Sequence, residues 1–177
     1  MYRVLTLEKY DDHRGYFYES YSRSLARELN QVFVQDNVSF SRAGSIRGLH
    51  YQWDDPMGKL VHVVRGSVID YIVDIRANSD TYGEYYQFEL NDQNNKILWV
   101  PPGYAHGFEA LEDTLVMYKC TAFYNPAGEG AISLFDPHVG IEYRTHRSEM
   151  LMSEKDKKAQ RLEEYIKDPK FAIRRNK

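Results

Sequence analysis

The sequence predicts an all-β fold, a jelly roll in which antiparallel strands enclose a cavity. Short segments that alternate apolar and polar residues recur along the chain, and turns rich in glycine and asparagine separate them. Tyrosine occurs 15 times, as expected for strands with half-buried walls. The 177 residues have the length of a single domain, and at this size the jelly roll is the common double-sheet arrangement.

The N-terminal part is expected to contain two strands joined by a short helix. Residues 16–20 and 32–40 have the alternation and the β-branched or aromatic content of strands. Within residues 24–30 the apolar side chains follow helical spacing, which predicts one or two helical turns.

The middle of the chain is expected to be β structure. Strands are predicted over residues 60–64, 68–75, 85–90, 97–100 and 114–124. Arg65-Gly66 predicts a turn after the first of these, residues 91–95 form a polar turn after the third, and a Pro-Pro-Gly corner ends the fourth.

The C-terminal part changes character and predicts a helix over about residues 153–166. Ser153 is a suitable N-cap, acidic residues follow in the first turn, and apolar side chains then share one face. Residues 170–177 are basic and terminal, so we expect them to fray.

Composition excludes several function classes. The net charge of -3 offers no basic field, so no nucleic-acid partner is expected. Cys120 is the only cysteine, which rules out a disulfide within the chain and metal sites built on several thiolates. The N-terminal segment lacks a secretory apolar core, and no apolar run is long enough to span a membrane. We therefore expect a soluble, cytoplasmic protein.

A Pro-x-Gly-x-x-His spacing ends at His106, and it is similar to the second motif of cupins. Metal-binding cupins add a His-x-His pair and a glutamate from their first motif, whereas His50 is followed here by tyrosine and glutamine. A catalytic metal usually takes three protein ligands. No metal is therefore expected, which leaves His50 and His106 for acid–base or hydrogen-bonding roles.

Further motifs include Arg-Gly-Leu-His-Tyr-Gln, Gly-Lys-Leu-Val, Ala-His-Gly-Phe and Ser-Glu-Lys-Asp. They lie in segments that stand in the order found in the dTDP-4-dehydrorhamnose 3,5-epimerase family, which are residues 12–20, 33–37, 47–52, 58–61, 73–76, 105–108 and 153–156. The chain resembles that family over nearly its whole length. The resemblance implies a cupin-type jelly roll, a homodimer with exchanged strands, and neither a metal nor an organic cofactor.

The resemblance also implies epimerisation at C3 and C5 of a nucleotide-linked 4-keto-6-deoxy sugar, converting dTDP-4-dehydro-6-deoxy-D-glucose into dTDP-4-dehydro-L-rhamnose. Hydrogens at C3 and C5 are acidic because each resulting enolate places charge on the C4 oxygen. The reaction needs a base on one face, a proton donor on the other, and positive charge near that oxygen.

Four residues match the family's catalytic positions. His50 resembles the base and Asp156 the carboxylate that orients it, while Tyr118 resembles the proton donor and Lys59 the cation beside the enolate. Structural alternatives stay open. His50 would otherwise be a hydrogen-bonded core residue, Tyr118 wall packing and Lys59 a solvated strand end, and Asp156 would only cap the C-terminal helix.

Ten further positions resemble substrate contacts. They are Arg14, Glu19, Gln35, Asp36, Asn37, Arg47, His106, Tyr124, Glu129 and Lys155. The arginines suit a diphosphate, the acids and amides suit nucleobase and sugar edges, and Tyr124 suits stacking on the base. Surface salt bridges and turn caps are the alternatives.

The chain departs from the family pattern near the expected nucleotide end. Residues 134–137 read Leu-Phe-Asp-Pro where the family commonly has Trp-x-Asp-Pro, and residues 141–144 read Ile-Glu-Tyr-Arg in place of Ile-x-Trp-Pro. An epimerase acting at C3 or C5 alone, on a dTDP-, GDP- or CDP-linked sugar, remains an alternative. A metal-dependent cupin isomerase or dioxygenase and a non-catalytic sugar-binding cupin are the others.

Overall fold

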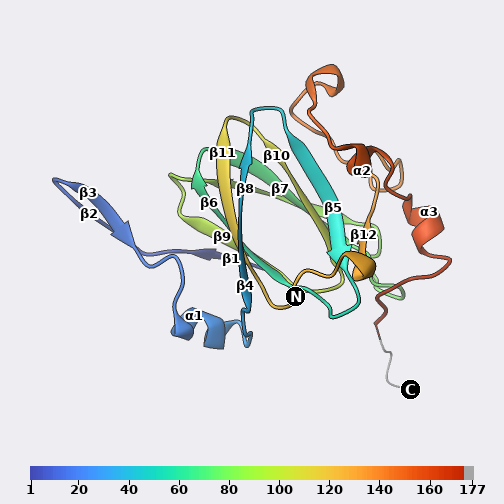
Figure 1. The fold of residues 1–177 in the computed structure, drawn as a ribbon, viewed down its shortest axis with the longest axis horizontal. Coiled ribbons are helices and arrows are strands. Elements are labelled where there is room, and N and C mark those ends of the chain that lie inside the picture. The colour runs from blue at the N-terminus through green and yellow to red at the C-terminus, as the bar shows by residue number, and fades with distance from the viewer. Residues whose placement is uncertain (174–177) are drawn as a thin grey trace.

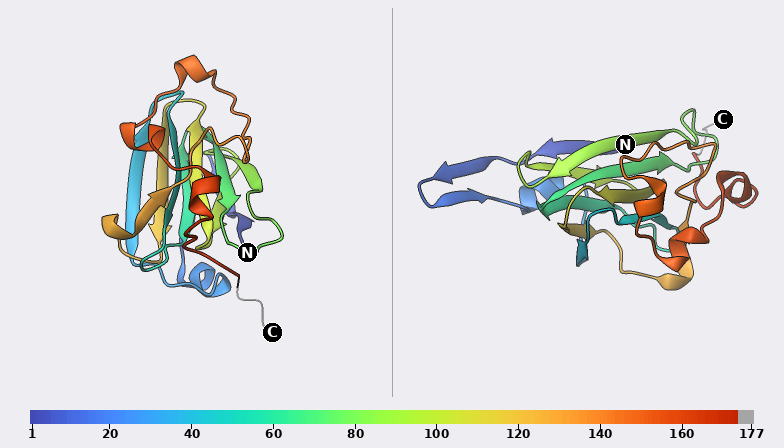
Figure 2. Two further views of the ribbon diagram at one scale, coloured as in Figure 1. Left: turned by 90° about the vertical axis from the view of Figure 1, so that its right-hand side faces the viewer. Right: turned by 90° about the horizontal axis from the view of Figure 1, so that it is seen from above.

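The computed structural model describes residues 1–173 and has two five-stranded antiparallel sheets that face each other (Figures 1 and 2). The first sheet has the strand order β1 (Arg3–Thr6), β9 (Lys96–Val100), β6 (Lys59–Arg65), β11 (Thr114–Cys120) and β4 (Gln35–Ser41). The second has the order β12 (Glu129–Ala131), β5 (Ile46–Gln52), β10 (Tyr104–Ala110), β7 (Ser67–Asp74) and β8 (Tyr85–Asn91). The predicted all-β jelly roll is confirmed.

Alternating residues of both sheets point inward and form the core between them. Val61 and Val116 come from the first sheet and meet Ile72 and Phe108 from the second. Because successive side chains of a strand point to opposite faces, polar residues two or four positions away from these core residues on the same strand also point inward. This alternation brings charged side chains into the interior.

The second sheet is covered on its outer face as well. Leu49 and Tyr71 pack there against Leu134, Leu162 and Tyr165 of the C-terminal segment. Every residue of β10 is consequently buried. The C-terminal segment therefore lies against the sheet that carries both histidines of the predicted site (Figure 2).

The N-terminal part forms a hairpin that projects from the two sheets (Figure 1). Its strands are β2 (Lys9–Asp12) and β3 (Gly15–Tyr18), and α1 (Arg23–Glu28) follows with Ser22 as N-cap. The expected strand at residues 16–20 and helix at residues 24–30 correspond to β3 and α1, displaced by one or two residues.

Several predicted boundaries were wrong. β4 begins at Gln35, three residues after the predicted start, and β11 ends at Cys120. The chain leaves the sheet after Cys120 because the Thr121 N–H donates to the carbonyl of Gly58 and the Tyr124 N–H donates to the side chain of Gln35. Strands β1, β2, β5, β10 and β12 were not among the predicted ranges.

The predicted single C-terminal helix is wrong. Two short helices, α2 (Glu154–Lys157) and α3 (Leu162–Tyr165), take its place. Between them Gln160 accepts a 2.7 Å hydrogen bond from the Ser133 N–H and donates its amide to the Tyr51 hydroxyl at 2.8 Å. These contacts hold the backbone in a bridge with Ile132, which a continuous helix would break.

The expected fraying is contradicted for residues 170–173. Ala172 forms a bridge with Ala77, and the N–H groups of Lys170 and Phe171 donate to the Tyr165 hydroxyl. Residues 174–177 lie outside the described part. Two 3₁₀ helices, Pro126–Gly128 and Arg147–Glu149, complete the fold, and none of the helices in residues 1–173 has the length and apolarity to cross a membrane.

Leu98→Ala is expected to lower the free energy of unfolding by about 2–5 kcal/mol, because Leu98 is fully buried between the sheets and truncation leaves a cavity. Urea denaturation followed by tyrosine and tryptophan fluorescence measures this. Val32→Ala is the matched control, since Val32 is 75% exposed, and its change is expected within about 0.5 kcal/mol. Equal effects at the two positions would contradict this core assignment.

Candidate active site

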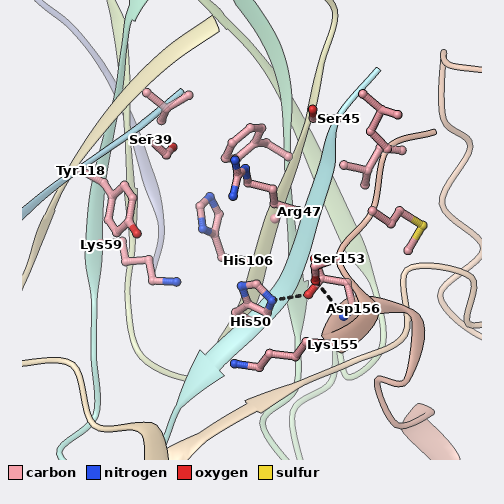
Figure 3. Close-up of a pocket in the computed structure, with 16 residues that line it drawn as sticks. Ser39, Ser45, Arg47, His50, Lys59, His106, Tyr118, Ser153, Lys155 and Asp156 are labelled. Carbon is pink, nitrogen blue, oxygen red and sulfur yellow. Dashed lines mark hydrogen bonds and ion pairs between the residues drawn. The ribbon is translucent and has the colours of Figure 1, made fainter. Parts of the chain in front are cut away.

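A cavity of about 450 Å³ lies between the two sheets and under the C-terminal segment. Seven predicted site residues line it, namely Arg47, His50, Lys59, His106, Tyr118, Lys155 and Asp156 (Figure 3). The volume is within the range of small-molecule sites.

The two sheets place different chemistry on opposite walls. Lys59 and Tyr118 come from β6 and β11 of the first sheet, whereas His50 and His106 come from β5 and β10 of the second. Figure 3 shows Tyr118 and His50 on opposite sides of the cavity. The Lys59 ammonium lies 5.9 Å from the centroid of the Tyr118 ring. A ligand in the cavity would lie between an imidazole and a phenol.

Two glycines bring the histidine strands close together. A Cβ on Gly48 would lie 2.5 Å from the Cα of Gly107, and one on Gly107 would lie 2.3 Å from the carbonyl oxygen of Arg47. Gly48 also has a φ of 123°, which favours glycine. The register is irregular at this point, and it pairs His50 with His106 across the two strands.

Asp156 holds His50 through a 2.7 Å hydrogen bond between its carboxylate and Nε2. The Asp156 side chain is almost fully buried, which raises its pKa, but the hydrogen bonds with His50 and Ser153 outweigh burial and leave the pKa below its ordinary value. The helix cap uses a different atom of the same residue, since the Asp156 backbone N–H donates to the Ser153 hydroxyl at 3.1 Å. The carboxylate is therefore free to orient the ring, leaving Nδ1 for proton transfer.

Asp156→Asn is expected to reduce turnover by about 10²-fold to 10⁴-fold, because an amide carries no charge to stabilise the imidazolium. The hydrogen bond with His50 helps to hold the pKa of Asp156 in the folded protein below its ordinary value, so the stabilising contribution of the carboxylate is present above the ordinary pKa and is lost as pH falls through the lowered pKa. Melting temperatures should differ between wild type and variant at neutral pH and converge in acid. A difference in melting temperature that stays constant from neutral pH to acid would contradict the role of the charge.

Burial affects the protonation of Tyr118 and Lys59, two residues on the wall opposite His50. It raises the pKa of the Tyr118 phenol, so the hydroxyl keeps its proton at neutral pH and is able to donate it. Burial lowers the pKa of Lys59, and nearby negative charges oppose that effect. Whether the Lys59 amine is protonated therefore depends on the negative charges near it.

A second hollow adjoins the cavity and shares His50, Lys59 and Tyr118 with it. It adds three predicted residues, Asn37, Tyr124 and Glu129. The Tyr124 hydroxyl donates to Glu129 at 2.9 Å and Lys155 forms an ion pair with the same carboxylate. Gln35 joins this group by donating to Asn37 at 2.9 Å and accepting from the Tyr124 backbone.

Arg47 lies at the cavity wall with an exposed side chain. Its guanidinium donates to the Ser41 hydroxyl at 2.9 Å and to the carbonyl of Phe40 at 3.0 Å. These bonds fix the group while donors remain for an anion.

Three predicted residues are not brought to the cavity within one chain. Arg14 pairs with Asp12 at the tip of the projecting hairpin, and Glu19 lies in a separate hollow between that hairpin and α1. Asp36 points outward from β4 and pairs with Lys119 at 2.9 Å.

The sequence interpretation missed Asp70 and Ser39. The fully buried Asp70 carboxylate accepts a 2.9 Å hydrogen bond from His106 Nε2, and the Ser39 hydroxyl is buried at the cavity wall without a partner among the described residues. An aspartate flanked by apolar residues in the middle of the predicted strand 68–75 was the available signal for Asp70. Residues 1–173 contain no cluster of three or more His, Cys, Asp or Glu side chains placed to bind a metal.

Comparison with known proteins agrees with this geometry. Residues 2–164 match the family described as dTDP-4-dehydrorhamnose 3,5-epimerase. A relative of that name from Methanothermobacter thermautotrophicus is 44% identical over 165 residues, which cover 91% of this chain and 89% of the relative.

Two solved structures of sugar-nucleotide epimerases are similar to this chain over nearly its whole length. The epimerase RmlC from Legionella pneumophila, in complex with dTDP-4-keto-L-rhamnose, superposes with a TM-score of 0.92 at 37% identity and covers 99% of this chain and 94% of its own. ChmJ, a 3'-monoepimerase from Streptomyces bikiniensis in complex with dTDP-quinovose, has a TM-score of 0.89 at 27% identity, with 97% and 89% covered. The chain belongs to the dTDP-4-dehydrorhamnose 3,5-epimerase family.

Proposed function

We propose that this protein epimerises C3 and C5 of dTDP-4-dehydro-6-deoxy-D-glucose to give dTDP-4-dehydro-L-rhamnose. The observation that carries the proposal is the pairing of a carboxylate-held imidazole, His50, with a protonated phenol, Tyr118, on opposite walls of one cavity. Family membership supports the same reaction.

His50 acts as the base. In a D-gluco pyranose the hydrogens on C3 and C5 lie on the same face of the ring, so one imidazole is able to remove each in turn. The negative charge of Asp156 stabilises the imidazolium that forms. Tyr118 delivers a proton to the opposite face, and exchange with solvent restores both groups.

Lys59 supports the enolate between these two steps. Charge develops on the C4 oxygen when the carbon-bound hydrogen leaves, and an ammonium fixed beside that oxygen stabilises the charge better than bulk water does. Arg47 suits the diphosphate, while Asn37, Tyr124 and Glu129 in the adjoining hollow suit the nucleoside.

The test incubates the purified protein with dTDP-4-dehydro-6-deoxy-D-glucose and determines the product configuration by NMR. Inversion at both carbons is expected, and inversion at one alone would make the protein a mono-epimerase.

Titration calorimetry with dTDP, GDP and CDP tests which nucleotide the protein prefers, with dTDP expected to bind most tightly. Elemental analysis is expected to find no stoichiometric metal, and a stoichiometric metal required for turnover would overturn the metal-free mechanism.

We also propose that the protein is a homodimer with exchanged N-terminal strands. The projecting hairpin exposes Tyr16 and Phe17, and the edge strand β4 exposes Val38 and Phe40 on its outer face. Exposed apolar edges of this kind favour association with a second copy. Exchange of the hairpin would carry Arg14 to the partner's cavity and give that residue its expected substrate contact.

Sedimentation velocity tests the dimer, and wild type is expected at twice the mass of one chain. Val38→Asp should shift the distribution toward monomer, because it buries an unpaired charge in the proposed interface. Val32→Asp is the control, since Val32 is exposed and precedes β4. A monomeric wild type would contradict the proposal.

We further propose a cytoplasmic location. The single buried cysteine, Cys120, suits a reducing compartment because no disulfide can form within the chain.

A further inference from the structure

Asp70 is a buried carboxylate to which the mechanism above gives no role. It lies on β7 with its side chain on the inward face, the face that also carries Val68 and Ile72. It is fully buried. One carboxylate oxygen accepts a 2.9 Å hydrogen bond from His106 Nε2, and the other has no partner among the described residues.

A carboxylate in this position is costly. Burial raises its pKa, and only His106 and Lys59 favour the charged form. An unpartnered oxygen on a buried carboxylate calls for an explanation beyond packing, because an apolar residue of similar size would avoid the desolvation cost. Both groups that stabilise Asp70 line the proposed substrate cavity.

The charged groups around Lys59 explain why Asp70 matters. Burial favours the neutral amine, and Lys155 adds repulsion. Glu129, Cys120 and Asp70 act in the opposite direction, and the Tyr118 ring faces the ammonium at 5.9 Å. Glu129 is already engaged by Lys155 and Tyr124, and burial raises the pKa of the Cys120 thiol. Asp70 therefore adds a fully buried negative charge that supports the Lys59 ammonium alongside Glu129.

We propose that Asp70 is a positioning residue that fixes the ring of His106 and keeps the Lys59 ammonium charged at the enolate-binding wall of the cavity. The proposal rests on the epimerase function inferred above. With Nε2–H of His106 donated to Asp70, Nδ1 is the ring nitrogen left to face a substrate. The register partners His50 and His106 thus each have a carboxylate of their own.

Asp70→Asn tests the charge because it keeps the shape and an acceptor for His106. Competitive acetylation with acetic anhydride, followed by mass spectrometry across a pH series, reports the fraction of neutral amine at Lys59, with exposed Lys158 as internal reference. The midpoint for Lys59 is expected to fall by about one pH unit, a tenfold change in its protonation equilibrium. Glu89→Gln removes an exposed charge from β8 and should leave the midpoint unchanged.

An unchanged Lys59 midpoint in Asp70→Asn would overturn the proposal, since it would show that Asp70 is uncharged or too weakly coupled. A second measurement needs only wild type and therefore does not depend on the variant folding. Nitrogen-15 NMR of His106 is expected to show a protonated Nε2, and a neutral ring protonated at Nδ1 would contradict the assignment. Both measurements are made without substrate, so failure of this proposal is distinguishable from failure of the proposed epimerase activity.

Discussion

His50→Ala is expected to lower turnover by about 10²-fold to 10⁴-fold, the usual contribution of a general base. The imidazole is the group that removes the hydrogens from C3 and C5, so both epimerisations should fail together. The substitution also removes the hydrogen bond to Asp156, so the buried carboxylate of Asp156 has no imidazole partner in the variant. Initial rates measured by NMR with the 4-keto sugar give the loss directly.

His138→Ala is the matched control for this change. The His138 side chain is 64% exposed and lies outside the cavity, so its removal should leave turnover near the wild-type value. Residual proton exchange at wild-type rates in His50→Ala would show that another group is the base. Circular dichroism of both variants separates loss of chemistry from loss of fold.

Tyr118→Phe is expected to slow inversion by about 10²-fold to 10⁴-fold while leaving exchange of the carbon-bound hydrogens in place. Burial raises the pKa of the phenol, so the wild-type hydroxyl carries the proton that the enolate receives. In the variant His50 still removes a hydrogen and returns one from the same face. Substrate recovered from deuterated water should therefore gain deuterium with its configuration retained.

Tyr86→Phe provides the comparison for the loss of a hydroxyl. Tyr86 is half-buried on β8, where its hydroxyl donates to Glu84 at 3.2 Å, and it does not line the cavity. Its turnover should match wild type. Full inversion by Tyr118→Phe would exclude Tyr118 as the donor and point to water or a second residue on that wall.

The sequence was sufficient for most strands because their alternation reflects burial on one face. The range 68–75 predicted β7 almost residue for residue, since its apolar run is long and bounded by turn signals. β10 was missed because His106, Gly107 and Glu109 interrupt the apolar pattern. The C-terminal helix was predicted too long, because only tertiary contacts made by Gln160 interrupt it.

Motif order predicted the cavity residues, but their mutual geometry required the fold. Nothing in local spacing reveals that Asp156 reaches His50 across more than one hundred positions, a separation of 106 residues. Asp70 was overlooked because it lies in no motif, and only the inward register of β7 brings it to His106. Arg14 and Glu19 lie far from the cavity in one chain, so their expected role depends on a second copy.

Turnover of dTDP-4-dehydro-6-deoxy-D-glucose in deuterated water tests the central claim most directly, because every proton delivered to carbon then comes from solvent-exchanged groups. With wild type, NMR and mass spectrometry should find deuterium at both C3 and C5 of a product inverted at both carbons. Product that keeps its original hydrogens at these carbons would contradict proton removal by His50 and proton delivery by Tyr118.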